Sequence, residues 1–261
     1  MPAAEMLTLA IEASNPTAPP APPTHPAPPT PPGPLPAADR QPARAGVAVG
    51  LIGQGTVRAL ACESLPGLDD AQLLPGIDRA VRRAGAKPAD LRAIAVSVGP
   101  GGFTGLRMAV AAAKMIALAT GASCIAVPTA RALARRAPAD AFAARRPVAV
   151  CLAWKREDAW VEVFDGPSAP PRSAGLVALR AIAELDLAAL IADGALIETM
   201  RQRGFMPAGL PAYEPAFDPV AVLEVAADLP AASADALAPL YPREPEAVTK
   251  WRALGRADAA R

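Results

Sequence analysis

The order of apolar and polar residues changes from strand-like to helical and back along this chain. MLTLAIEAS at 6–14 is almost continuously apolar and predicts a buried first strand. RAGVAVGLIGQGTVRALACES at 44–64 contains two strand-like runs around GQG, which predict a hairpin. Helical and strand-like segments alternate after this hairpin. The pattern therefore predicts an α/β protein with a mixed sheet.

A first helix is expected within residues 69–91, because apolar residues recur there at helical spacing. The residues with this three- and four-residue spacing are Leu73, Leu74, Ile77, Ala80, Val81 and Ala84. Gly85 follows an arginine-rich turn and should end the helix. Pro75 is compatible only with a helix that begins close before it. The apolar run RAIAVSV at 92–98 predicts the next strand.

A second helix is expected over 106–120, and it is apolar around most of its circumference. Only Arg107 and Lys114 are charged, and together with Leu118 they form one narrow stripe. A helix of this kind is buried on more than one side, so a second lobe or a partner chain should cover what its own sheet does not. Gly121 ends the helix, and SCIAVP at 123–128 predicts a further strand.

The segment 15–42 differs sharply from the rest in composition. It contains 13 of the chain's 32 prolines, which excludes a helix or a central strand. A polyproline-II-like or disordered insert is expected there. It could be a ligand for an SH3-like or WW-like domain, but a tolerated low-complexity insert is the favoured interpretation.

Charge and cysteine content exclude several classes of function. The net charge is +1 over 261 residues, too small for the chain to hold nucleic acid tightly by itself. The three cysteines are widely spaced and form no CxxC pair, which fits a reduced cytoplasmic protein without a disulfide framework. We expect no signal peptide, because the N-terminus has no basic region, and no membrane span.

The glycine cluster at 99–107 resembles a phosphate-binding loop but completes no nucleotide motif. A P-loop requires Lys and Ser or Thr after its last glycine, where this chain has Leu106 and Arg107. A dinucleotide loop requires a third glycine where Thr104 stands. Two interpretations remain, a backbone anion site and a tight strand-to-helix turn with Thr104 as N-cap, and the pattern favours the turn. The candidate anion-binding residues are Gly99, Gly101, Gly102, Thr104, Gly105 and Arg107.

GPGGFTGLRMAVAAAKMIALATGASCIAVPTARALA resembles the signature region of the TsaB (YeaZ-like) family. Four further blocks are similar to that family in the same order: LTLAIEAS, QLLPGIDRAVRRAG, CLAWKREDAWVEVF and PLYPREPEAVTKWRAL. The resemblance leaves out the Pro-rich segment and most of residues 165–238.

This resemblance implies an actin-like fold of the sugar-kinase/Hsp70 (ASKHA) type with two lobes. We expect a first lobe at 1–128 with an insert at about 15–43, a second lobe at 129–218, and a C-terminal helix and basic tail at 219–261. The implied role is that of a non-catalytic, cytoplasmic dimerisation subunit in the formation of N6-threonylcarbamoyladenosine at position 37 of tRNA.

The implied partners are a catalytic TsaD-type subunit, a TsaE-type ATPase and a second copy of this chain, with tRNA bound only within the complex. The family pairs through two helices. The residues expected at that interface are Leu73, Leu74, Ile77, Val81, Phe103, Leu106, Ala109, Val110, Ala113 and Ala117.

Little catalytic chemistry is expected from the chain itself. Its single histidine, His25, lies in the Pro-rich segment, so neither a closed transition-metal site nor a catalytic triad is expected. Glu12 stands where the family usually has Asp; it could coordinate Mg²⁺, but a structural role is favoured. No intrinsic cofactor is expected, although ATP or ADP could bind in the complex. The alternative function is a weak nucleotide-binding or ATP-hydrolysing enzyme of the same fold.

Overall fold

The first sheet combines an antiparallel meander with two parallel strands. The computed structural model describes residues 5–15, 45–53, 56–65, 70–243 and 251. The strands of this sheet lie in the order β3-β2-β1-β4-β5. Their bounds are β1 Met6–Glu12, β2 Gly46–Gly53, β3 Thr56–Ser64, β4 Ala93–Gly99 and β5 Ser123–Pro128. The β2 and β3 strands confirm the predicted hairpin, and β4 and β5 run parallel to β1.

The second sheet repeats the arrangement of the first. Its strands are β6 Val148–Lys155, β7 Asp158–Phe164, β8 Pro171–Ala178, β9 Ala189–Ile191 and β10 Ala212–Tyr213. Their order is β10-β9-β6-β7-β8, so β6 takes the place that β1 has in the first sheet. In each sheet three antiparallel strands are followed by two parallel ones. The predicted α/β class with mixed sheets is confirmed.

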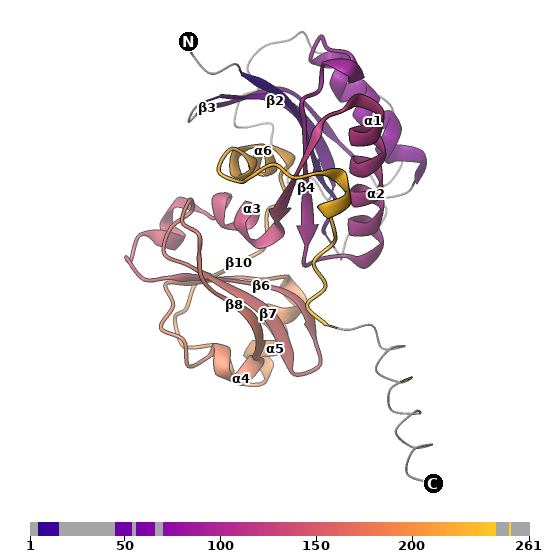
Figure 1. Ribbon diagram of the computed structural model, residues 1–261. Helices are drawn as coiled ribbons and strands as arrows, with labels where there is room; N and C mark the ends of the chain where they lie inside the picture. Colours follow the sequence, from indigo (N-terminus) through magenta and orange to yellow (C-terminus); the bar gives the residue numbers. More distant parts are fainter. Residues whose placement is uncertain (1–4, 16–44, 54–55, 66–69, 244–250, 252–261) are drawn as a thin grey trace, which may run out of the picture.

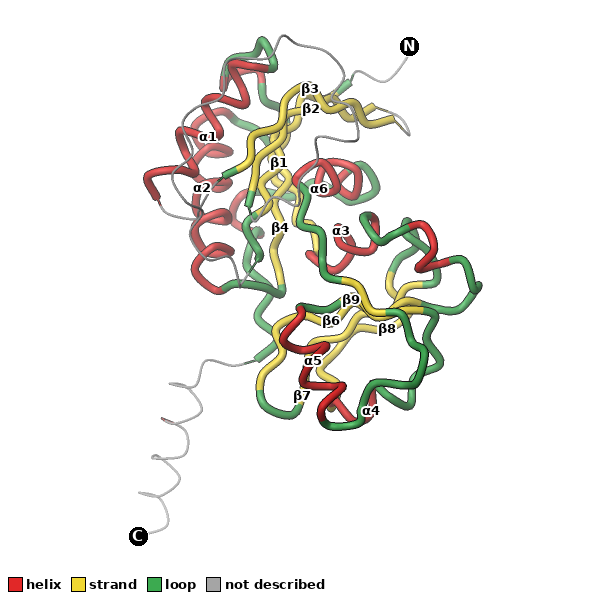
Figure 2. The backbone as a smooth tube through the Cα atoms, turned by 180° about the vertical axis from the view of Figure 1, so that it is seen from behind, coloured by secondary structure: helices red, strands yellow, loops and turns green. Residues whose placement is uncertain are grey.

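The helices form layers outside and between the two sheets (Figures 1 and 2). The outer face of the first sheet is covered by α1 (Asp70–Arg83) and α2 (Phe103–Thr120). Between the sheets lie α3 (Thr129–Arg135) and α6 (Pro219–Ala226). The outer face of the second sheet is covered by α4 (Leu179–Ile182) and α5 (Gly194–Gln202). The 3₁₀ turns are η2 Pro88–Asp90, η3 Ala139–Phe142 and η4 Ala234–Ala236.

The start of α2 differs from the prediction, whereas both long helices end at the predicted glycines. Gly102, not Thr104, is the N-cap of α2, so the prediction for Thr104 is wrong. Gly102 has the extended backbone of an N-cap because the loop lies against β1 at this residue. The first helix ends at Arg83, and Gly85, with a φ of 71°, follows in the closing turn, as predicted. Pro75 lies well inside α1, in its second turn.

The predicted domain bounds remain a prediction. The helix that opens the predicted second lobe, α3, packs against β4 and β5 of the first sheet as well as against β6. The helix that opens the predicted tail, α6, packs on the first sheet. Of the Pro-rich insert, residues 16–44 lie outside the described part of the chain, as do residues 244–250 and 252–261 of the tail.

Candidate partner-binding helix and glycine loop

The glycine loop connects β4 to α2 and packs directly against the end of β1. The amide of Gly102 donates a hydrogen bond of 2.7 Å to the carbonyl oxygen of Ser14. A Cβ atom on Gly101 would lie only 2.2 Å from that oxygen. Gly99 has a φ of 105°, and a Cβ there would meet Leu106 at 2.8 Å. The positive φ at 99 and the close approach of the Ser14 backbone at 101 therefore account for these two glycines without a ligand.

The other candidate anion-binding residues do not gather into one site. Gly105 is buried within the first turn of α2, whereas Thr104 and Arg107 are exposed. The guanidinium carbon of Arg107 lies 4.3 Å from the ring centroid of Phe103, in cation–π geometry. The loop forms the tight strand-to-helix turn that the sequence favoured. Anion binding by this loop stays a prediction.

Glu12 lies beneath the loop as a buried carboxyl with donors on both oxygens. Its Oε1 accepts hydrogen bonds from the Ser14 amide at 2.8 Å and from the Ser14 hydroxyl, and its Oε2 accepts one from the Ser97 hydroxyl. The residue is 1% exposed. Burial raises the pKa of the Glu12 carboxyl, although the bonds from Ser14 and Ser97 act in the opposite direction. These contacts join the ends of β1 and β4 and fit the structural role favoured for Glu12.

Most residues predicted at the partner interface face the chain's own core. Eight of the ten are buried: Leu73, Ile77, Val81, Leu106, Ala109, Val110, Ala113 and Ala117. Only Leu74 and Phe103 are exposed. The eight were chosen because they share the apolar stripes of α1 and α2, and those stripes pack on the first sheet. The structure therefore places eight of the ten against the chain's own sheet, and the partner interface remains a prediction.

A different set of residues forms the surface of α2. We define the α2 outer face by five exposed residues of the helix, Phe103, Arg107, Ala111, Met115 and Leu118; Thr104 and Ala119 are exposed beside them. Spacings of four, four, four and three residues place the five along one side of the helix. Phe103 is 51%, Met115 58% and Leu118 74% exposed, so this side is largely apolar. The sequence could have indicated this exposed side, because Arg107 and Leu118 belong to the stripe that carries the charged residues of the helix.

Aromatic residues of β7 contribute to the packing of the second sheet. Phe164 is fully buried between α3 and the second sheet. Trp160 donates a hydrogen bond of 2.9 Å from its indole nitrogen to the buried carboxyl of Glu162. Burial also raises the pKa of Glu162.

Arg136 links the two helices that lie between the sheets. Its guanidinium donates to both carboxylate oxygens of Glu224, at 2.7 and 2.9 Å, and to Asp218 at 2.5 Å. Asp218 also accepts a hydrogen bond from the Val220 amide and caps α6. The end of α3 is thus fixed to the start of α6 by a charge-assisted network.

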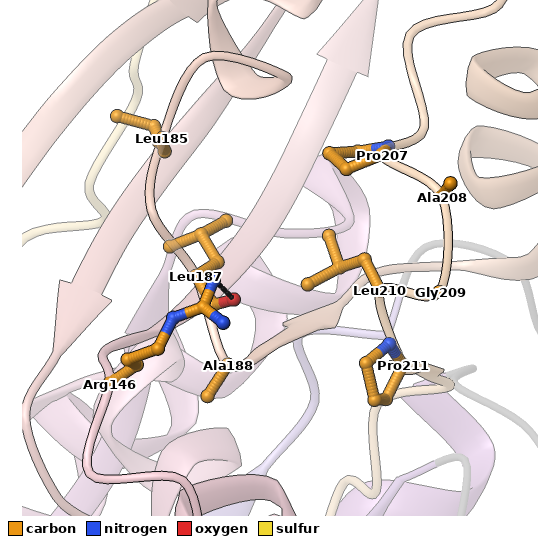
Figure 3. A pocket seen from close by; sticks show the side chains of 9 residues that line it. All are labelled: Arg146, Leu185, Leu187, Ala188, Pro207, Ala208, Gly209, Leu210 and Pro211. Carbon is orange, nitrogen blue, oxygen red and sulfur yellow. Dashed lines mark hydrogen bonds between the residues drawn. The ribbon is translucent and has the colours of Figure 1, made fainter.

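A shallow pocket of about 130 Å³ lies on the second sheet's side of the molecule, between residues 185–188 and 207–211 (Figure 3). The Arg146 guanidinium at its rim donates a hydrogen bond to the Leu187 carbonyl and pairs with Asp186. Within the described ranges, no three His, Cys, Asp or Glu side chains are placed to hold a metal ion. His25 lies outside those ranges.

By length and apolar composition, α2 could cross a membrane. It lies on the first sheet with one side in the core, however, and a core helix meets the same two criteria.

Comparisons with known proteins agree with this architecture. Residues 70–156 match the family model of TsaD, tRNA N6-adenosine threonylcarbamoyltransferase. No curated protein sequence matches the chain. YeaZ from Pseudomonas aeruginosa superposes with a TM-score of 0.62 and 20% identity, covering 90% of this chain and 99% of that one. The chain has the actin-like fold of YeaZ.

A second solved structure gives the same result. It is an uncharacterised protein with similarity to the peptidase YeaZ from Pseudomonas aeruginosa, and it superposes with a TM-score of 0.62 and 19% identity. The alignment covers 91% of this chain and 100% of that one. The YeaZ-like fold implied by the sequence motifs is confirmed, and the TsaD match extends from the start of α1 to the turn after β6.

Proposed function

We propose that this chain is a non-catalytic subunit for the formation of N6-threonylcarbamoyladenosine at position 37 of tRNA. It acts by binding a catalytic TsaD-type subunit through the α2 outer face and thereby activating that subunit. The observation that carries the proposal is the apolar surface of α2, which lies within the segment that matches the TsaD family model on a YeaZ-like fold. The match and the fold support a place in this tRNA modification system.

The partner that fits the α2 outer face is another actin-like chain with an apolar helix pair of its own. Burying what remains exposed of Phe103, Met115 and Leu118 contributes about 1–2 kcal/mol for each side chain, because they are between half and three-quarters exposed. That total is of the size needed to offset the free energy lost when two chains associate. Leu74 on α1 is also exposed and adds a second helix to the docking surface. Without the catalytic partner, the same face would pair two copies of this chain.

In this proposal the TsaD-type subunit, and not this chain, catalyses the tRNA modification. In the described part of this chain the glycine loop is closed against β1, and both oxygens of Glu12 already accept hydrogen bonds. No specific observation therefore favours the alternative of a nucleotide-hydrolysing enzyme. ATP or ADP, a TsaE-type ATPase and tRNA join only in the assembled complex, and the proposed location is the cytoplasm.

The test is Met115→Glu, with Leu176→Glu as the matched control. Both side chains are large, apolar and exposed, but Leu176 lies on β8 of the second sheet. Glutamate at 115 should weaken binding to the purified TsaD-type subunit by about a hundredfold, because a carboxylate would be desolvated in the interface. Calorimetry and a reconstituted tRNA modification assay measure the effect. Wild-type affinity in the Met115 variant would refute the proposal, as would tRNA modification or robust ATP turnover by this chain alone.

A further inference from the structure

The chain after α6 forms a strap that crosses from the first sheet to the second. We define the C-terminal strap as residues 232–243, the gold segment that descends past β4 and α2 in Figure 1. Ala232 exchanges two backbone hydrogen bonds with Cys124 at the edge of β5. Leu237 is buried in the core beneath α1 and α2. The Leu240 amide then donates a 2.7 Å hydrogen bond to the Val98 carbonyl in β4.

Next along the strap, Tyr241 lies against the first residue of α2. The ring centroids of Tyr241 and Phe103 are 5.3 Å apart, with an angle of 38° between the ring planes. Arg107 lies over the same Phe103 ring. Tyr241 stays 39% exposed despite this contact. It therefore extends the α2 outer face beyond the helix by one further aromatic surface.

Two residues later, Arg243 attaches the strap to the hairpin between β6 and β7. Its guanidinium donates to the Ala153 carbonyl at 2.5 Å, to the Asp158 carbonyl at 3.0 Å and to the Asp158 carboxylate. The side chain is 26% exposed. Because a guanidinium held by three acceptors has little freedom, the end of the strap at Arg243 is fixed. Tyr241 is thus held from two sides, by the Leu240 bond to β4 and by the Arg243 bonds to the second sheet.

Resting on the proposed function, we infer that Tyr241 contacts the partner directly and that Arg243 is the positioning residue that holds it there. Tyrosine at an interface contributes a large, rigid surface at a small cost in conformational entropy. The hairpin of β6 and β7 is thereby coupled to the α2 outer face. A movement of the second sheet would therefore shift Tyr241 and change the affinity of a partner bound at α2.

The experiment compares variants in their affinity for the purified TsaD-type subunit. Tyr241→Ala should raise the Kd about tenfold, whereas Tyr241→Phe, which keeps the ring, should remain within about twofold. Arg243→Gln should raise the Kd by a similar factor. The double variant should bind no more weakly than either single variant, because both changes remove the same contact. Arg203→Gln is the matched control, since Arg203 pairs with Glu157 in the same hairpin but lies off the strap.

A measurement on the unaltered protein keeps the inference testable if a variant folds poorly. Hydrogen exchange at the amides of Tyr241 and Arg243 should slow when the partner is bound, and unchanged exchange would overturn the inference. The inference would also be overturned if Tyr241→Ala binds with wild-type affinity while Met115→Glu fails to bind. That outcome would leave the proposed function intact. If both variants bind like wild type, the proposed function itself fails. Fully additive effects of the Tyr241 and Arg243 changes would remove the positioning role of Arg243.

Discussion

The amide of Gly102 donates a 2.7 Å hydrogen bond to the carbonyl oxygen of Ser14, and this bond closes the glycine loop onto β1. Ser14 is held from its other side as well, because its amide and hydroxyl donate to the buried Glu12 carboxyl. The start of α2 is therefore tied to the end of β1 through one residue. A loop that resembles a phosphate-binding loop in sequence therefore connects α2 to the end of the central strand β1.

We expect Gly101→Ala to destabilise the protein by about 1–3 kcal/mol, because its Cβ would overlap the Ser14 carbonyl oxygen. Gly175→Ala is the matched control, since a Cβ at that glycine in β8 meets no atom within 4 Å. Urea unfolding of both variants measures the difference. Equal stability of the two variants would show that the loop can move away from Ser14 at no cost.

Ala113 and Ala111 lie two residues apart on α2 and should respond oppositely to a charge. Ala113 is fully buried, so Ala113→Glu should destabilise the monomer by about 3 kcal/mol or more. Ala111 is exposed on the α2 outer face, so Ala111→Glu should change stability by about 0.5 kcal/mol or less and weaken partner binding. Circular dichroism and light scattering distinguish the two effects. A folded, non-binding Ala113 variant would place the interface on the opposite side of the helix.

The five strands of the first sheet and the two long helices could be predicted from the sequence. Continuous apolar runs such as MLTLAIEAS identify strands that are buried on both faces, and Gly121 marks the end of α2. The repetition of one sheet topology could not be predicted. Strands as short as Ala189–Ile191 and Ala212–Tyr213 carry too few residues for a periodic signal.

The sequence indicates α2 as the candidate site but does not indicate which of its residues are exposed. Apolar periodicity identifies the side of a helix that is buried, and it cannot state whether the chain's own sheet or a partner covers that side. The ten chosen residues followed the strongest apolar stripes, so eight of them lie in the core. The exposed apolar residues Met115 and Leu118 share their side of the helix with a charge, which made that side look polar. Tyr241 and Arg243 join the site through contacts between distant segments, which no local pattern shows.

The Glu12 carboxyl should make stability depend on pH. Its folded-state pKa lies above the ordinary value of 4.5, so the unfolded chain loses this proton first as pH rises. Its contribution to stability is therefore complete below about pH 4.5 and declines as pH rises from there. Glu12→Gln removes the titration. The unfolding free energy of the wild type, minus that of the variant, should fall between pH 4.5 and pH 8, and urea titrations at several pH values measure it. A difference that does not change with pH would contradict the inferred shift.

The Pro-rich segment joins two chain ends that already lie next to each other. Glu12 at the end of β1 is the direct cross-strand partner of Gly46 at the start of β2. A hairpin loop of a few residues can span such neighbouring ends, so the fold does not need a connection of this length. We therefore expect the sheet to form when residues 16–44 are replaced by a five-residue Gly/Ser/Asn linker.

Because the cost of closing a loop grows only logarithmically with its length, the replacement should change stability by about 1 kcal/mol or less. Calorimetric melting of both forms measures the change, and affinity for the partner should be unaltered because the α2 outer face is untouched. A replacement that also removes Ala45 is the control. The Ala45 carbonyl accepts a 2.9 Å hydrogen bond from the Leu65 amide, so this longer deletion should cost additional stability. If the shorter replacement lowers the melting temperature by more than about 8 °C, the segment packs against the folded protein and the low-complexity interpretation is wrong.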